Sequence, residues 1–264
     1  DRVLALLAVT LARVDPVAPF DQWGVSEAAQ AVVGTPGPHL VEVTAVAAGE
    51  GGPLPRATNI AERVGRIPAG ETPIRIERYV TDSGETEIDV YLAGTQEWGV
   101  GATVEPFDME SNLALVAGVS AASMVAVEAA MGKAGVKPGD RVSFVGHSQG
   151  GLLAARLAES GRYATSSLLT VGAPLGTVAP SGNYPALAIS HRDDLVPELG
   201  GASKPTRITH VETHSGANAF DLAGAHAREA YVDTAARVDA SPARENFPHW
   251  ESAGEGNSQL FSAK

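Results

Sequence analysis

The chain has 264 residues, 44% of them hydrophobic and 5% aromatic, and a formal charge of −12 from 19 Lys and Arg against 31 Asp and Glu. This composition excludes a disordered acidic chain and provides enough apolar residues for a folded core. A net acidic chain without a basic run is a poor ligand for nucleic acid or anionic membranes. The sequence has no cysteine, which excludes disulfides, thiolate metal sites and a cysteine nucleophile.

The first 73 residues are divided into short pieces by proline and glycine, with one candidate strand at 40–46. We expect residues 1–73 to be an N-terminal extension that packs on, or caps, the domain after it. Residues 3–12 are apolar but too few to span a bilayer. Their helical spacing predicts a packing helix. The alternative, a remnant of a membrane or signal segment, slightly favours a secreted or cell-envelope location over a cytoplasmic one.

From residue 74 the pattern becomes regular, and alternating apolar residues predict a β-hairpin over 74–93. The later predicted elements are strands at 141–145, 167–171, 186–190 and 206–211, and helices at 111–135, 150–160 and 226–238. This alternation predicts an α/β protein with a mostly parallel central sheet, an antiparallel N-terminal edge and helices on both faces. We assign this domain to residues 74–240. Residues 241–264 are polar and contain two prolines, so we expect a loose C-terminal tail.

A G-x-S-x-G sequence lies between a predicted strand and a predicted helix, and consists of Gly146, His147, Ser148, Gln149 and Gly150. In this context the motif indicates a sharp strand-to-helix turn that holds its serine in a strained conformation above the carboxyl end of the sheet. The glycines allow the close backbone approach that the turn needs. Ser148 is therefore the candidate nucleophile, and the backbone N–H of Gln149 is a candidate oxyanion donor. The alternative is a glycine-rich turn with a helix-capping serine.

A serine nucleophile needs a base, and a carboxylate that orients the base, in the chain order Ser, acid, His for a sheet of this kind. Asp193 and Asp194 follow the predicted strand 186–190. We prefer Asp194, because the apolar residues after it would anchor it against the core, and keep Asp193 as the alternative acid. The base belongs on the loop before the last helix, where His226 and His214 lie. We prefer His226, since a helix N-terminus disfavours the imidazolium.

A second oxyanion donor is expected on the loop after an early strand. That loop begins after the hairpin, and its Thr95 offers both a backbone N–H and a hydroxyl; the alternative is an ordinary strand-ending turn. We expect the pocket to lie under the loops at 96–110 and 176–184. The residues available for an apolar acyl site are Val100, Val104, Phe107, Met109 and Leu195.

Three motifs, GHSQGG, HRDDLVP after a strand, and HAREAY at the start of the last helix, resemble the serine α/β-hydrolases of the lipase and esterase type. The stretch VYLAGTQEW resembles the strand and oxyanion loop of class 3, fungal-type lipases, although Gln149 stands where those lipases usually have Leu. The resemblance covers about residues 74–238 and implies an α/β-hydrolase fold. It implies Ser148 as nucleophile, Asp194 as acid, His226 as base, and Thr95 with Gln149 as oxyanion donors.

The resemblance implies a carboxylic ester hydrolase, a carboxylesterase or triacylglycerol lipase, that works through an acyl-enzyme without a cofactor. No His, Asp or Glu spacing suggests a metal site, and no nucleotide-binding glycine motif is present in the sequence. The expected partner is a small-molecule or lipid ester and not a nucleic acid, with contact to a lipid interface left open. The alternatives are an acyltransferase or thioesterase with the same triad, and a non-catalytic binding module on a hydrolase scaffold.

Overall fold

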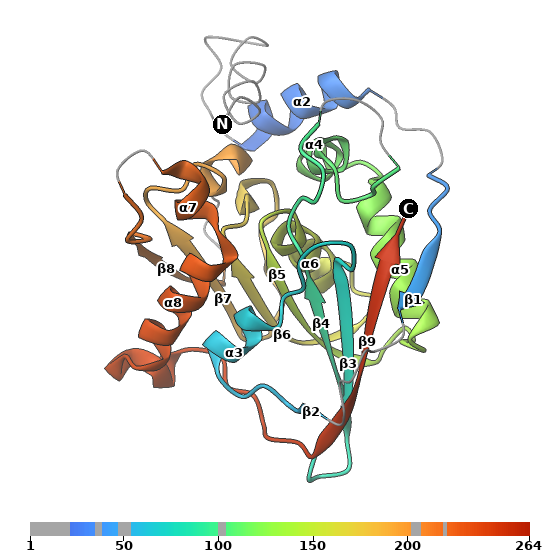
Figure 1. Cartoon of the computed structure of the whole chain (residues 1–264), viewed down its shortest axis with the longest axis vertical. Helices are drawn as coiled ribbons and strands as arrows, with labels where there is room; N and C mark the ends of the chain where they lie inside the picture. The colour runs from blue at the N-terminus through green and yellow to red at the C-terminus, as the bar shows by residue number, and fades with distance from the viewer. Residues whose placement is uncertain (1–21, 35–38, 47–53, 100–103, 202–206, 219–220) are drawn as a thin grey trace.

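The computed structural model describes residues 22–34, 39–46, 54–99, 104–201, 207–218 and 221–264. Within them the chain forms a central β-sheet with helices on both faces (Figure 1). The helix predicted at 3–12 lies outside the described residues. The strands are β1 (Val43–Val46), β2 (Leu54–Pro55), β3 (Ile74–Val80), β4 (Thr86–Leu92), β5 (Arg141–His147), β6 (Ala164–Val171), β7 (Ala186–His191), β8 (Thr209–Thr213) and β9 (Glu255–Ala263).

The strands are arranged in the order β1-β9-β3-β4-β5-β6-β7-β8, and the short β2 pairs with β9. Strands β4 to β8 are parallel to one another, whereas β1, β9 and β3 pair antiparallel. The predicted hairpin is present as β3 and β4, with Ile74 opposite Leu92 and Val80 opposite Thr86. The prediction of a mostly parallel sheet with an antiparallel edge is therefore confirmed.

The prediction of a loose tail over 241–264 is wrong. Residues Glu255–Ala263 form β9, which pairs with both β1 and β3 and is the red strand in Figure 1. Only Phe261 and Ala263 of this strand are buried, so its sequence lacks the regular apolar alternation that marks a half-buried strand. Backbone pairing with two neighbours, and not apolar content, defines β9.

The helices are α2 (Gln22–Val33), α3 (Ile60–Gly65), α4 (Met109–Ala117), α5 (Ala122–Lys133), α6 (Gln149–Glu159), α7 (Leu222–His226) and α8 (Arg228–Asp239). The single helix predicted over 111–135 is two helices, because Gly118 adopts a left-handed conformation with φ 76° and ends α4. The helix predicted from 226 is likewise divided at Ala227, which has extended backbone angles. Among the described residues no single helix is long and apolar enough to cross a membrane; α4 and α5 meet that criterion only as a pair bent by 92°.

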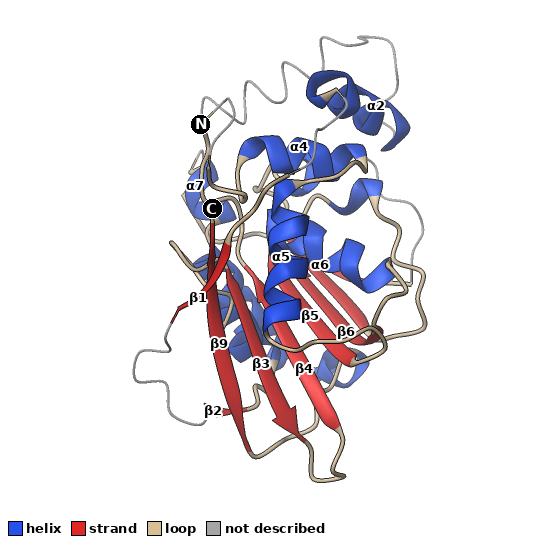
Figure 2. Ribbon diagram, turned by 90° about the vertical axis from the view of Figure 1, so that its right-hand side faces the viewer, coloured by secondary structure: helices blue, strands red, loops and turns tan. Residues whose placement is uncertain are grey.

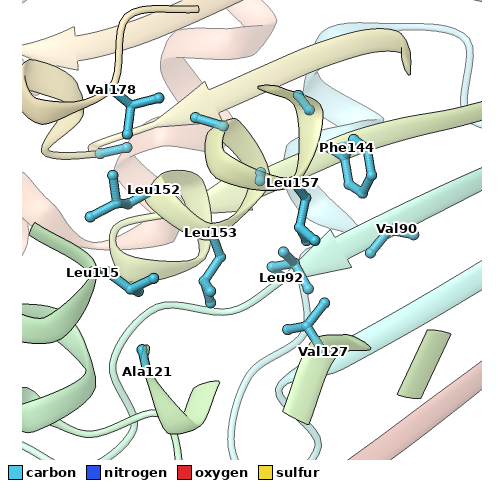
Figure 3. Packing of buried hydrophobic residues seen from close by; sticks show 14 of the residues in the cluster. Val90, Leu92, Leu115, Ala121, Val127, Phe144, Leu152, Leu153, Leu157 and Val178 are labelled. Atoms are coloured by element: carbon cyan, nitrogen blue, oxygen red, sulfur yellow. The ribbon is translucent and has the colours of Figure 1, made fainter. Parts of the chain in front are cut away.

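Two apolar cores cover the two faces of the sheet. Figure 2 shows α4, α5 and α6 on one face, and Figure 3 shows side chains of α6, such as Leu153 and Leu157, against Val90 and Leu92 of β4. The intervening Tyr91 points to the opposite face, where α3 and α8 pack. This alternation along β4 is what a strand buried on both faces requires.

The described part of the predicted N-terminal extension, 1–73, is integrated with the sheet. Strand β1 pairs with β9, and helix α3 packs against α8. Arg63 of α3 is fully buried and donates hydrogen bonds to Asp89 of β4 and Ser143 of β5. Residues of this segment therefore form part of the second core.

Candidate active site

The turn between β5 and α6 has the strained geometry that the G-x-S-x-G sequence predicts. Ser148 has φ 55° and ψ −124°, and is the only non-glycine residue with positive φ in the described part of the chain. A Cβ atom at Gly146 would lie 2.1 Å from the carbonyl oxygen of Gly150, and one at Gly150 would lie 2.3 Å from that of Leu92. Only glycine can occupy either position, and the turn presents Ser148 at the carboxyl end of β5.

Ser148, His226 and Asp194 form a continuous hydrogen-bonded row. The Oγ of Ser148 lies 2.9 Å from Nε2 of His226, and Nδ1 of His226 lies 2.7 Å from Oδ2 of Asp194. The carboxylate accepts from Nδ1–H, so Nε2 is left to accept from the serine hydroxyl. All three residues are buried: Ser148 and Asp194 are each 2% exposed and His226 is 9% exposed. The structure thus brings together the preferred nucleophile, base and acid from three separate segments.

Asp194 lies just beyond the end of β7 and is held by further donors. The backbone N–H of Val196 donates to Oδ1 at 2.9 Å, and the phenol of Tyr231 donates to Oδ2 at 2.7 Å. Burial alone would raise the pKa of Asp194, but the hydrogen bonds from His226, Val196 and Tyr231 outweigh it and hold the pKa below its ordinary value. The carboxylate is therefore charged when the imidazole is neutral.

The alternative acid and base do not join this row. Asp193 accepts hydrogen bonds from the backbone N–H and hydroxyl of Ser215, and its pKa is lowered because these bonds outweigh desolvation. His214 is largely exposed, and its Nδ1 lies 3.8 Å from Asp193. The two residues form a surface loop contact beside the site.

The two predicted oxyanion donors both lie next to Ser148. Gln149 is the first residue of α6, where backbone N–H groups have no acceptor within the helix. Its side chain donates from Nε2 to the carbonyl oxygen of Asp108 at 3.0 Å, so the residue is fixed. Thr95 is buried, and its Oγ1 accepts a hydrogen bond of 2.6 Å from Nδ2 of Asn112. This bond leaves the hydroxyl proton of Thr95 available for another acceptor.

His147 lies beside the nucleophile with its ring against His226. The two ring centroids are 4.7 Å apart, and Nε2 of His147 is 2.9 Å from the carbonyl oxygen of His226. Burial, followed by the proximity of His226, lowers the pKa of His147 to about 3. The ring is therefore neutral at the pH of most cells.

A cleft of about 150 Å³ opens onto Ser148 and His226. Its other lining residues are Pro68, Ala69, Gly94, Thr95, Gln96, Trp98, His147, Arg228 and Glu229. The loop after β4 therefore lines the cleft as expected, whereas the loop at 176–184 does not, and residues before β3 take its place.

The residues expected to form an apolar acyl site are scattered. Phe107 and Met109 are buried in the protein interior, and Leu195 is 49% exposed. Val104 lines a different cavity of about 300 Å³ between α4 and the segment at 39–41. Val100 lies outside the described residues. Among the described residues, no group of three or more His, Asp or Glu side chains could hold a metal ion.

Tyr231 and Asn112 are site residues that the sequence analysis missed. Tyr231 lies on α8, five positions after His226, and its ring also stacks on His191 at 3.9 Å between centroids. Asn112 is the last polar side chain in the first turn of α4, before an apolar helical stretch. The side-chain amide of Asn112 is a feature that the sequence shows. The contact between Tyr231 and Asp194 joins residues that are 37 positions apart, and no sequence pattern indicates it.

The chain matches no protein-family model, and no curated protein and no solved structure matches it. The geometry of Ser148, His226 and Asp194 is therefore the basis for assigning a function.

Proposed function

We propose that this protein is a carboxylic ester hydrolase with an α/β-hydrolase fold, in which Ser148 is the nucleophile. The observation that carries the proposal is the pair of short distances from His226, 2.9 Å to Ser148 and 2.7 Å to Asp194. A serine on a strained strand-to-helix turn, a histidine within hydrogen-bond reach and a buried carboxylate behind it are the parts that acyl transfer needs. A serine that only capped the helix would need neither the histidine nor the carboxylate.

The reaction follows from these contacts. Ser148 Oγ attacks the ester carbonyl carbon while Nε2 of His226 takes the hydroxyl proton, and the buried charge of Asp194 stabilises the imidazolium that forms. The proton then passes to the departing alcohol, leaving an acyl group on Ser148. Water attacks this acyl-enzyme with His226 again as the base, which releases the acid and restores the serine.

Developing charge on the carbonyl oxygen needs donors that are already in place. The backbone N–H of Gln149, the next residue after the nucleophile, and the N–H and hydroxyl of Thr95, which lines the same cleft, are suitable groups. The hydrogen bond from Asn112 supports this role for Thr95, since it occupies the acceptor side of the hydroxyl and orients the residue.

The size of the cleft favours small esters. Its volume of about 150 Å³ is below the roughly 300–1,000 Å³ of sites for drug-sized ligands. We therefore place the activity on the carboxylesterase side of the range, with short acyl chains preferred over long lipid chains.

Hydrolysis of p-nitrophenyl esters from acetate to palmitate tests the proposal. We expect activity to be highest at acetate to butyrate, and Ser148→Ala to lower kcat/KM by at least about 10³-fold without unfolding the chain. A fluorophosphonate probe should label the wild-type protein and the Ser252→Ala control, in which an exposed serine is removed, but not Ser148→Ala. Equal hydrolysis by wild type and Ser148→Ala, or the absence of both labelling and hydrolysis, would overturn the assignment.

A further inference from the structure

His147 presents a fixed hydrogen-bond acceptor to the active-site cleft. Its Nε2 lies 2.9 Å from the carbonyl oxygen of His226, and a carbonyl oxygen can only accept. Nε2 of His147 therefore carries the ring proton. Since the neutral ring has only one N–H, Nδ1 must bear a lone pair.

This lone pair is not used by the protein. Within the described residues, Nε2 is the only ring nitrogen of His147 with a hydrogen-bond partner. The residue lines the cleft together with Ser148. Gly94, on the same wall, has no side chain: a Cβ there would lie 3.2 Å from Nδ1 of His147 and 3.0 Å from Cβ of Ser148. The space between Nδ1 and the nucleophile is thus kept open by a glycine.

Two other polar side chains of the cleft, Arg228 and Gln96, are already engaged. Arg228 donates to the carbonyl oxygens of Gly65 and Ile67 and to the carboxylate of Glu229, and the side-chain amide of Gln96 donates to the carbonyl oxygen of Gly94. His147 Nδ1 is therefore an acceptor without a competing donor from these neighbours. A neutral acceptor of this kind attracts a neutral hydroxyl or N–H and offers nothing to a carboxylate.

We propose that His147 is a specificity-determining residue, whose Nδ1 accepts a hydrogen bond from a hydroxyl or amide N–H that the substrate carries within a few bonds of the scissile ester. The inference rests on the proposed ester hydrolase function and narrows its substrate class to donor-bearing esters. The donor can belong to the acyl part, as in a 2-hydroxy ester, or to the alcohol part, as in a glycol ester. The low pKa of His147 keeps this acceptor unprotonated at neutral pH.

Two pairs of esters that differ by exchange of a hydroxyl for a methyl group test the proposal and separate these sources. Phenyl 2-hydroxypropanoate is compared with phenyl 2-methylpropanoate for the acyl part, and 2-hydroxyethyl butanoate with propyl butanoate for the alcohol part. Each ratio of kcat/KM is divided by the ratio of the alkaline hydrolysis rates, which removes intrinsic reactivity. We expect the hydroxylated ester to be preferred by about five- to tenfold in at least one pair, the size of one hydrogen bond.

Two substitutions separate recognition from a structural role. His147→Met removes both the hydrogen-bond donor and the acceptor of the ring. It should bring the corrected ratio of kcat/KM for the two esters of a pair close to one. His147→Gln can donate to the carbonyl oxygen of His226 through its amide nitrogen and still offer an amide oxygen, so it should retain most of the preference. If His147 only holds the backbone of His226, His147→Met lowers kcat/KM for both esters of a pair equally. An unchanged ratio, or a wild-type ratio near one in both pairs, overturns the proposal.

A measurement without turnover keeps the inference distinguishable from the proposed function. In the Ser148→Ala variant labelled with ¹⁵N-histidine, the unprotonated Nδ1 signal of His147, assigned by its loss in His147→Gln, should move upfield on addition of 2-hydroxyethyl butanoate and not of propyl butanoate. This result would support the inference even if the wild-type enzyme hydrolysed no ester. A protonated Nδ1, or the same response to both esters, would contradict it.

Discussion

Two buried aspartates, Asp89 within β4 and Asp194 just beyond β7, are held by different kinds of partner. Asp89 is fully buried and accepts hydrogen bonds of 2.9–3.0 Å from the guanidinium groups of Arg56 and Arg63. Asp194 accepts from a histidine ring, a phenol and a backbone N–H. Burial raises the pKa of each carboxyl, and in both cases the partners outweigh burial and leave the pKa below its ordinary value.

The difference lies in what the partners do to the charge. Two arginines neutralise Asp89, so this group fastens the segment before β3 to the sheet and has no charge to offer. None of the donors to Asp194 carries a permanent positive charge, as an arginine does, so its negative charge can act on His226. A buried carboxylate is thus structural or chemically useful according to whether its donors carry a positive charge.

The largest effect should come from removing the charge at Asp194. The uncharged amide of Asp194→Asn cannot stabilise the imidazolium that forms on His226. We therefore expect kcat/KM to fall by about 10³–10⁴-fold. The free energy of unfolding, measured in urea, should change by no more than about 1 kcal/mol. A loss of activity below tenfold would mean that Asp194 does not act on the base.

Asp89→Asn should have the opposite effect, a large loss of stability with little change in activity. It leaves the buried guanidinium of Arg63 without a countercharge and that of Arg56 with Glu87 alone, and we expect the free energy of unfolding to fall by about 3–5 kcal/mol. Activity per folded molecule should be retained at low temperature. Asp82→Asn, in the exposed turn between β3 and β4, is the matched control. Equal stabilities of the two variants would show that the arginines do not depend on Asp89.

Low pH should destabilise the protein through His147 before it affects either aspartate. The pKa of His147 is lowered by burial to about 3, against about 6.5 for an ordinary histidine. Between these values the unfolded state binds a proton that the folded state rejects, so stability falls as pH falls from about 6.5 towards 3. The aspartates, whose pKa values are lowered, lose their stabilising contribution only below about 3.9.

Urea unfolding of wild type and His147→Gln at pH 7, 6, 5 and 4.5 measures this contribution. The variant should lose stability less steeply than wild type over this range. His191, whose pKa is also lowered by burial, contributes equally to both proteins. Parallel stability curves would show that His147 takes up a proton in the folded state.

The smallest effect should follow from Tyr231→Phe. It removes one of the neutral donors to Asp194, and we expect a loss of about 1 kcal/mol, or roughly fivefold in kcat/KM. Because the pKa of Asp194 rises when a donor is lost, the acid limb of the pH profile should move to higher pH. Tyr163→Phe, which changes a tyrosine on the opposite face of the sheet, is the control. The same pH profile for both variants would show that Tyr231 does not act on Asp194.

The residues of the candidate site were predictable where their placement depends on local sequence. Short motifs mark the strand-to-helix turn at Ser148. They also mark Asp194 and His226, which follow it in the expected chain order. Tyr231 and Arg63 could not be predicted, because their partners are distant in sequence and no periodicity encodes an ion pair or a phenol–carboxylate contact. Strand β9 was missed for a related reason: its polar sequence becomes a strand only when β1 and β3 supply partners on both sides.

The position of β9 also has a consequence for synthesis of the chain. Strand β3 is made well before β9, and one of its two edges stays unpaired until β9 leaves the ribosome. At about 5–20 residues per second, the roughly 175 residues between them take about nine to thirty-five seconds. During that time the nascent chain exposes an open strand edge, the kind of surface at which polypeptides aggregate. Completion of the sheet therefore waits for synthesis of β9, and slower translation lengthens the period in which this edge is open.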